Sequence, residues 1–358
     1  MKIKDFLKIM VEKQASDLFL RTGGIPHLRV DGRVCPIDNM IMSTDDMQHI
    51  INEVLTTDEQ KRKLQQELDV DFVLSLPDLG RFRFNVFIQR GTPSIVVRYV
   101  KDKIQTFEEL NLPAEILKNF ASESRGLVLV TGPAGSGKST TISCMLDYIN
   151  ETSCRHIITV EDPIEFLFRD KNSVFNQREL GLDVQSYPSA LKHFTLQSPD
   201  VIYIGVIRDN ETMMAAMTAA EMGVLVVSTF HTINTVQTIE RIVNFYPPHI
   251  HEEVRMQLSL LLKGIICLRL VPKKDGNGRI PAYETMVVTP SIARVIREGK
   301  LTEISHFIEE GEMFGMRSFK QSLVKLVTEG KVEEADARCS ADSRDEFDLE
   351  LRGIKRIA

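Results

Sequence analysis

The stretch GLVLVTGPAGSGKST, residues 126–140, decides how the rest of the chain is interpreted. It begins with an apolar run typical of a buried strand and ends in the pattern G-x-x-x-x-G-K-[ST], where a helix is expected to start. The glycines of this pattern let successive backbone N–H groups face a single anion at a helix N-terminus. A chance glycine-rich turn would lack the flanking strand and helix, so the sequence predicts a phosphate-binding loop for a nucleotide. Its residues are Gly132, Pro133, Ala134, Gly135, Ser136, Gly137, Lys138, Ser139 and Thr140.

Two side chains of this loop have separate expected roles. Lys138 supplies a cation for the outer phosphates of ATP, and the Ser139 hydroxyl suits a magnesium ion. ATP and Mg²⁺ are therefore the expected cofactors.

Apolar runs continue beyond the loop with a regular spacing. The stretches 155–163, 201–207 and 223–230 are rich in β-branched residues and are separated by helical patterns. Strands that are apolar on both faces and alternate with helices predict a parallel sheet covered on both sides. We therefore assign residues 123–290 to an α/β core that carries the phosphate loop.

The segments outside this core differ in pattern. Residues 1–104 mix helices with alternating strands and are predicted to form an α+β domain. Residues 105–122 are interpreted as a linker and a helix that leads into the core, and residues 291–335 as a C-terminal helical region. The last segment, 336–358, is rich in Asp, Glu, Arg and Ser and is predicted to be a charged, disordered tail.

The composition narrows the class of protein. The chain has 358 residues, 43% of them hydrophobic and 26% charged, as expected for a globular protein of two or three domains. Its net charge of −6 argues against a nucleic-acid partner, and its five scattered cysteines contain no CxxC pair that would indicate zinc. The N-terminal stretch is an amphipathic helix pattern, and no apolar run approaches the roughly 18 residues of a membrane span. A cytoplasmic location is expected.

Acidic residues lie at the end of the second apolar run. Glu161, Asp162 and Glu165 lie in VEDPIE, and ligands of open parallel sheets bind beyond the carboxyl ends of the strands. These carboxylates are therefore placed to orient water or a hydrated magnesium ion. The alternative is a set of acidic residues that only cap the turn around Pro163.

A histidine follows the last apolar run. His231, in STFHTINT, is placed to hydrogen-bond the terminal phosphate and so to report whether that phosphate is present. The alternative is a histidine that satisfies carbonyl groups of its own loop.

In order and spacing, several stretches resemble the secretion-type hexameric ATPases, and within them the type IV pilus retraction ATPases. They include GPAGSGKST, ITVEDPIEF, SPDVIYIGVIRD, STFHT and TIERIVNFYPP, and the likeness extends from SDLFL near the N-terminus to IREGKLTEISHFIEEGEMFGMRSFKQSLVKL. The related assembly ATPases usually carry a paired CxxC zinc motif. Its absence here favours the retraction branch and no bound zinc.

This resemblance implies an architecture and an activity. The expected fold is a PAS-like N-terminal domain followed by a RecA-like P-loop ATPase domain, in a ring of six identical chains or a ring mixed with a paralog. Such rings hydrolyse ATP between subunits and drive pilus retraction, which produces twitching motility. The implied partner is an inner-membrane platform protein, so the chain would be cytoplasmic and peripheral at the inner membrane.

The resemblance also implies roles for individual residues. Glu161 is the leading candidate to polarise the attacking water and to assist Ser139 with the metal, and His231 matches the family's histidine box. The nucleotide-contacting arginines of the family match Arg81, Arg83 and Arg98, which would stabilise the charge on the transferring phosphoryl group. The alternative for these arginines is a set of solvated cations on an exposed strand face.

Three positions depart from the family pattern. Gly205-Val206-Ile207-Arg208-Asp209 stands where the family has Gly-Glu-[Ile/Met]-Arg-Asp, so a strand-end glutamate is replaced by Val206. Phe19 replaces a histidine of the N-terminal domain, without an obvious catalytic consequence. The stretch PSIARVIREGK matches the retraction motif only in part, which bears on retraction itself more than on the ATPase family.

Val206 has a predicted catalytic consequence. It cannot accept a hydrogen bond from metal-bound water or take a proton, and the loss of a positioned acid or base typically costs about 10²–10⁴ in rate. Asp200 is expected at the wrong end of the strand and Asp209 beyond the site. We predict retained nucleotide binding with impaired hydrolysis. Three functions stay open: a retraction motor, a hydrolysis-poor paralog that assists an active ring, and a DNA- or signalling-linked P-loop protein.

Overall fold

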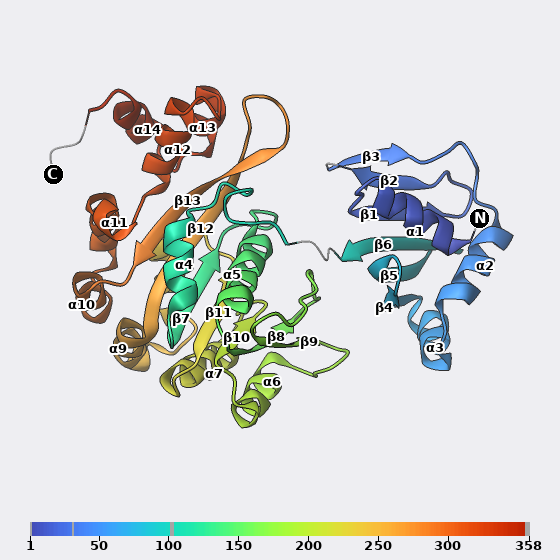
Figure 1. Cartoon of the computed structure of the whole chain (residues 1–358), viewed down its shortest axis with the longest axis horizontal. Helices are drawn as coiled ribbons and strands as arrows, with labels where there is room; N and C mark the ends of the chain where they lie inside the picture. The colour runs from blue at the N-terminus through green and yellow to red at the C-terminus, as the bar shows by residue number, and fades with distance from the viewer. Residues whose placement is uncertain (1, 31, 101–103, 355–358) are drawn as a thin grey trace. The chain divides into compact units, whose positions relative to one another are not determined.

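The computed structural model describes residues 2–30, 32–100 and 104–354 (Figure 1). The chain divides into two compact units, Met1–Lys103 and Ile104–Ala358. In the described part of the chain, no helix has both the length and the apolar character that a membrane span requires.

In its described residues, the first unit is an antiparallel sheet of six strands with three helices, in agreement with the expected α+β pattern. The strand order is β3-β2-β1-β6-β5-β4. Helix α1 (Ile3–Glu12) turns its apolar stripe into the core of this unit, as the amphipathic pattern predicts. The other elements are α2 (Thr44–Val54), α3 (Asp58–Glu67), β1 (Asp17–Arg21), β2 (His27–Val30), β3 (Arg33–Pro36), β4 (Asp69–Leu76), β5 (Gly80–Gln89) and β6 (Thr92–Val100).

The second unit is built on a seven-stranded sheet of order β13-β12-β7-β11-β10-β8-β9. All neighbouring strands pair in parallel except β13, which pairs antiparallel with β12 at one edge. The predicted parallel sheet is thus confirmed. Its strands are β7 (Gly126–Thr131), β8 (His156–Glu161), β9 (Val174–Glu179), β10 (Val201–Ile204), β11 (Leu225–Phe230), β12 (Leu262–Pro272) and β13 (Arg279–Val287).

Helices cover both faces of this sheet, which explains why its central strands are apolar throughout. In β7, Leu127 and Leu129 belong to one core cluster, and Val128 and Val130 belong to the other. The second cluster includes α4 (Ala114–Ser122) and α5 (Lys138–Thr152). The first includes α6 (Tyr187–Phe194), α7 (Asn210–Glu221), α8 (Thr235–Val243), α9 (His251–Leu261), α10 (Pro290–Glu298), α11 (Ile304–Glu310) and α12 (Phe319–Thr328). Short 3₁₀ turns lie at Thr195–Gln197, Pro248–Ile250, Leu301–Glu303 and Glu312–Phe314.

The register of the parallel strands brings distant loops to one edge. Ile204 of β10 pairs with Val160 of β8 and with Ser228 of β11, and Phe230 of β11 pairs with Thr131 of β7. The residues that directly follow these four strands therefore meet at the carboxyl edge of the sheet, where ligands of such sheets bind.

The prediction of a disordered tail over 336–358 is wrong for the described part of that segment. Residues in it form α13 (Glu334–Ser340) and α14 (Arg344–Leu351), and the side chain of Phe347 is fully buried in the core of the second unit. The high charge of the segment obscured its few apolar anchors, whose burial is enough to fix two short helices. Residues 355–358 lie outside the described part of the chain. The segment 105–122, which comes before the core in the chain, is also packed in the second unit, through Phe107 and α4.

Candidate nucleotide site

The glycine-rich loop joins β7 to α5, as its sequence predicts. Gly132, Gly135 and Gly137 all have positive φ, and α5 begins at Lys138. A Cβ atom on Gly132 would lie 2.5 Å from the Leu268 carbonyl oxygen and from Ser136 Oγ. A side chain there is excluded both by the backbone conformation and by space. The loop therefore needs glycine to expose its N–H groups at the start of a helix.

Lys138 is the central cation of the loop. Its Nζ atom donates hydrogen bonds to the carbonyl oxygens of Gly132 at 2.9 Å and Pro133 at 2.8 Å. Burial lowers the pKa of Lys138, while the charge of Glu165 acts in the opposite direction. The ammonium group thus lies partly desolvated at the mouth of the loop, where its attraction to phosphate is strengthened.

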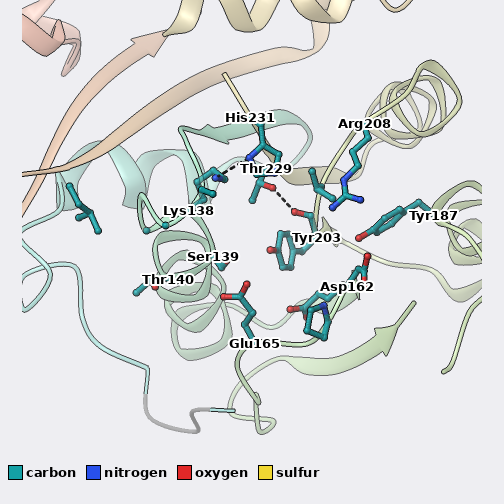
Figure 2. A pocket seen from close by; sticks show the side chains of 18 of the residues that line it. Lys138, Ser139, Thr140, Asp162, Glu165, Tyr187, Tyr203, Arg208, Thr229 and His231 are labelled. Carbon is teal, nitrogen blue, oxygen red and sulfur yellow. Dashed lines mark hydrogen bonds between the residues drawn. The ribbon is translucent and has the colours of Figure 1, made fainter. Parts of the chain in front are cut away.

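A cavity of ≈ 450 Å³ opens at the carboxyl edge of the sheet (Figure 2). It brings together Lys138, Ser139, Glu161, Val206 and His231, which come from four different strand ends. Other loop residues that line it are Ala134, Gly135, Gly137 and Thr140, whereas Gly132, Pro133 and Ser136 shape the loop without lining the cavity. Figure 2 shows His231 beside Lys138, and Glu165 near Ser139, with Asp162 farther from the loop.

Glu161 is the buried acid of the site. It is the last residue of β8 and only 5% exposed, and its Oε1 atom accepts hydrogen bonds from Thr159 Oγ1 at 2.7 Å and Gln177 Nε2 at 3.2 Å. Burial raises the pKa of the Glu161 carboxyl to about 7, although both hydrogen bonds act against the rise. A carboxylate with a pKa near neutrality is suited to accept a proton from water.

The raised pKa of Glu161 predicts a pH-dependent stability. A carboxyl whose pKa rises from 4.5 to about 7 on folding stabilises the fold only while it is protonated, and this contribution is lost as the pH rises through about 7. Relative to Glu161→Gln, the wild-type free energy of unfolding should fall by about 3 kcal/mol between pH 5 and pH 8.5. Denaturant titrations of both proteins at the two pH values measure this difference. A constant difference would show that Glu161 keeps an ordinary pKa.

His231 follows β11 and faces the cavity. Its Nδ1 atom lies 3.4 Å from Lys138 Nζ, and its carbonyl oxygen accepts a hydrogen bond from Arg241 Nη1 at 2.9 Å. Partial burial, followed by the charge of Lys138, lowers the pKa of His231. The imidazole is therefore neutral at pH 7 and offers one donor and one acceptor nitrogen.

Val206 lies at the position where the family resemblance predicts a strand-end carboxylate. It lines the cavity after β10 and is 7% exposed, and its side chain offers the site only methyl groups. The two neighbouring carboxylates do not replace it. Asp200 lies at the opposite end of β10, where it accepts a hydrogen bond from the His156 N–H, and Asp209 caps α7 through the Thr212 N–H at 2.8 Å.

The three predicted arginines all lie in the first unit. Arg83 Nε donates to Asp71 at 2.9 Å, and Arg98 Nε donates to Asp17 at 3.1 Å, so these two side chains form ion pairs. Arg81 lies on β5 beside them. Whether they contact nucleotide stays a prediction.

Several lining residues had no role assigned from the sequence: Tyr187, Tyr203, Arg208 and Arg279. Arg208 lies four residues after the end of β10, two positions after Val206, and that position was the available signal. Tyr187 and Arg279 come from α6 and β13, and only the folded chain brings them to the cavity.

The cavity also fits a magnesium ion. Ser139, Glu161, Asp162 and Glu165 offer the hard oxygen atoms that this ion prefers. Within the described residues, however, no group of three or more His, Cys, Asp or Glu side chains could hold a metal. Ser139 and Glu161 stay the predicted residues that would hold this ion together with the nucleotide.

Comparison with known proteins gives consistent results. A family model described as Type II/IV secretion system protein matches residues 2–337. The chain is 40% identical over 352 residues to the Type IV pilus ATPase PilU of Pseudomonas aeruginosa, covering 98% of this chain and 92% of the relative. It is 39% identical over 347 residues to the Type IV pilus retractation ATPase PilT of the same organism, covering 97% and 100%.

A solved structure agrees with these sequence matches. The crystal structure of the pilus retraction motor PilT with bound ADP has a TM-score of 0.90 and 39% identity, covering 97% of this chain and 98% of that one. The family resemblance inferred from the motifs is thereby confirmed. The chain belongs to the type II/IV secretion system protein family, as a relative of its pilus ATPases.

Proposed function

We propose that this chain is an ATP-hydrolysing motor of a type IV pilus system that drives pilus retraction. The observation that carries the proposal is the single cavity in which Lys138 of the phosphate loop, buried Glu161 and His231 meet. The near full-length similarity to a pilus retraction motor supports it. The chain would act in a ring of six, peripheral at the inner membrane, on a platform protein of the pilus machine.

Each residue has a chemical role in this proposal. The loop N–H groups and Lys138 hold the phosphates, and magnesium, when bound, neutralises the charge that develops on them. Glu161 accepts the proton of the attacking water, and His231 contacts the terminal phosphate. Arg81, Arg83 and Arg98 would supply positive charge to the transferring phosphoryl group from the N-terminal unit.

Val206 favours a second candidate function. A valine in the cavity wall cannot orient water, so the chain would bind ATP and hydrolyse it slowly while assisting an active ring as a paralog. Similarity to both PilU and PilT is compatible with either role.

Lys138→Ala distinguishes the two candidates in a steady-state ATPase assay. The wild type should show measurable but low turnover, and the variant should lose it together with about tenfold or more of its ATP affinity, because a charge-assisted contact to phosphate is removed. Wild-type turnover no higher than that of Lys138→Ala would favour the hydrolysis-poor paralog. For the pilus role, expression in a strain without its own retraction ATPase should restore twitching, and failure to restore it would count against a motor.

A further inference from the structure

Arg269, on β12, contacts three separate segments of the second unit. Its Nη2 atom donates to the Ile233 carbonyl oxygen at 3.0 Å and to Asp342 Oδ1 at 2.6 Å, and its Nη1 atom donates to the Ser340 carbonyl oxygen at 2.9 Å. The guanidinium group also lies 3.8 Å from the ring centroid of Phe319. One largely buried side chain therefore joins the loop after β11, α12 and the junction between α13 and α14.

The loop that Arg269 contacts carries His231 at its first position. Arg241 holds the start of this loop through the His231 carbonyl oxygen, and Glu284 holds its end by accepting from both the N–H and the Oγ1 of Thr235 at 2.8 Å. Arg269 holds the middle, at Ile233. Buried Thr232 and the Ile233 N–H make further polar contacts, with Thr238 Oγ1 at 2.7 Å and Gln237 Oε1 at 3.0 Å, so Arg269 is one of several groups that fix residues 231–235.

Apolar packing contributes little to the middle of this loop. The Ile233 side chain is 48% exposed, so polar contacts must define the backbone position there. Loops with few buried apolar contacts open at low free-energy cost, and each lost hydrogen bond is then felt directly. The placement of His231 therefore depends on groups outside the cavity.

The other end of the contact lies in the C-terminal helices. Buried Phe347 attaches these helices to the core of the second unit, and an ion pair between Arg338 and Asp348 at 2.9 Å joins α13 to α14. The matched family model ends at residue 337, so Ser340 and Asp342 lie beyond the part of the chain that it describes. The contact therefore connects the histidine loop to a segment outside that family match.

We propose that Arg269 is a positioning residue that couples α13 and α14 to the loop 231–235, and that this coupling sets the affinity of the site for the terminal phosphate of ATP. The inference rests on the proposed function for the contact between His231 and that phosphate. A planar guanidinium can hold three oxygen acceptors in a fixed fork, whereas a lysine ammonium cannot reproduce that geometry. Because coupling is reciprocal, nucleotide at the loop must also stabilise the C-terminal helices.

Arg269→Lys tests this coupling, since it keeps the positive charge and removes the planar guanidinium group with its fixed N–H donors. In the full chain, amide hydrogen exchange over residues 231–238 should become about tenfold faster, and the affinity for a non-hydrolysable ATP analogue should fall about tenfold while ADP affinity is unchanged. Asp342→Asn, which removes the charge of one acceptor at constant size but keeps an oxygen that can accept, should give a smaller change in the same direction. In the wild type, the analogue should slow exchange over 340–343, and Arg269→Lys should abolish this protection.

Asp348→Asn is the matched control, because it breaks an ion pair in the same two helices that does not involve Arg269. In this variant, the rate of amide hydrogen exchange over residues 231–238 and the nucleotide affinities should equal those of the wild type. The proposal would be overturned if Arg269→Lys left the exchange rate of residues 231–238 at the wild-type value. Equal effects of Asp348→Asn and Asp342→Asn would also overturn it. The exchange measurements do not depend on turnover, so a wild type without ATPase activity would contradict the motor function and leave the coupling supported.

Discussion

Replacing Val206 with glutamate is expected to raise the rate of ATP hydrolysis by about 10²–10⁴-fold, the usual contribution of a positioned acid or base. The backbone at this position is already fixed on both sides. The Gly205 N–H donates to the Val160 carbonyl oxygen at 2.7 Å, and the Ile207 N–H donates to the Thr229 carbonyl oxygen at 3.2 Å. A carboxylate at 206 would therefore project into the cavity that Ser139 and Glu161 line, where it can orient metal-bound water.

Val206→Gln provides the control for size and polarity. It has the shape of glutamate but cannot take a proton or carry a charge, so its turnover should stay within a few-fold of the wild type. ATP affinity should be similar in all three proteins, because the phosphate loop supplies it independently. Steady-state ATPase assays and nucleotide titrations measure both quantities. Turnover unchanged by Val206→Glu would show that the position is dispensable and that Glu161 alone sustains hydrolysis.

Glu161→Gln is expected to have the opposite effect, a loss of about 10²–10⁴ in the rate of hydrolysis, since the proton acceptor is removed. The fold should survive the change. The amide oxygen of glutamine can still accept from Thr159 Oγ1 and Gln177 Nε2, which both donate to Oε1 in the wild type. Single-turnover assays with ATP bound at saturation would separate this loss from any change in affinity.

Two further measurements define the role of Glu161. Wild-type kcat/KM should rise with pH through about 7, where the carboxyl ionises, and the residual activity of Glu161→Gln should lack this rise. Glu165→Gln removes a charge from the same cavity at an exposed position and should cost only a few-fold. A loss in Glu165→Gln as large as that in Glu161→Gln would move the proton acceptor away from Glu161.

The sequence predicted those features that depend on neighbouring residues. The glycines of the phosphate loop, the apolar strands and the helix after Lys138 follow from local conformation and periodicity. The same approach failed for 336–358, because a high average charge hid the apolar contact that Phe347 makes with distant elements. It also gave no role to Tyr187 or Arg279, which reach the cavity from α6 and β13.

By itself, the sequence predicted a phosphate-binding loop on a parallel sheet and, through the family resemblance, a strand-end carboxylate that is replaced by Val206. These conclusions rest on backbone conformation and on the identity of single side chains. Only the tertiary structure decided that Glu161 is buried enough to have a pKa of about 7, and that Arg269 joins the His231 loop to the C-terminal helices. Burial and contacts between residues distant in sequence arise from packing, so no local pattern encodes them.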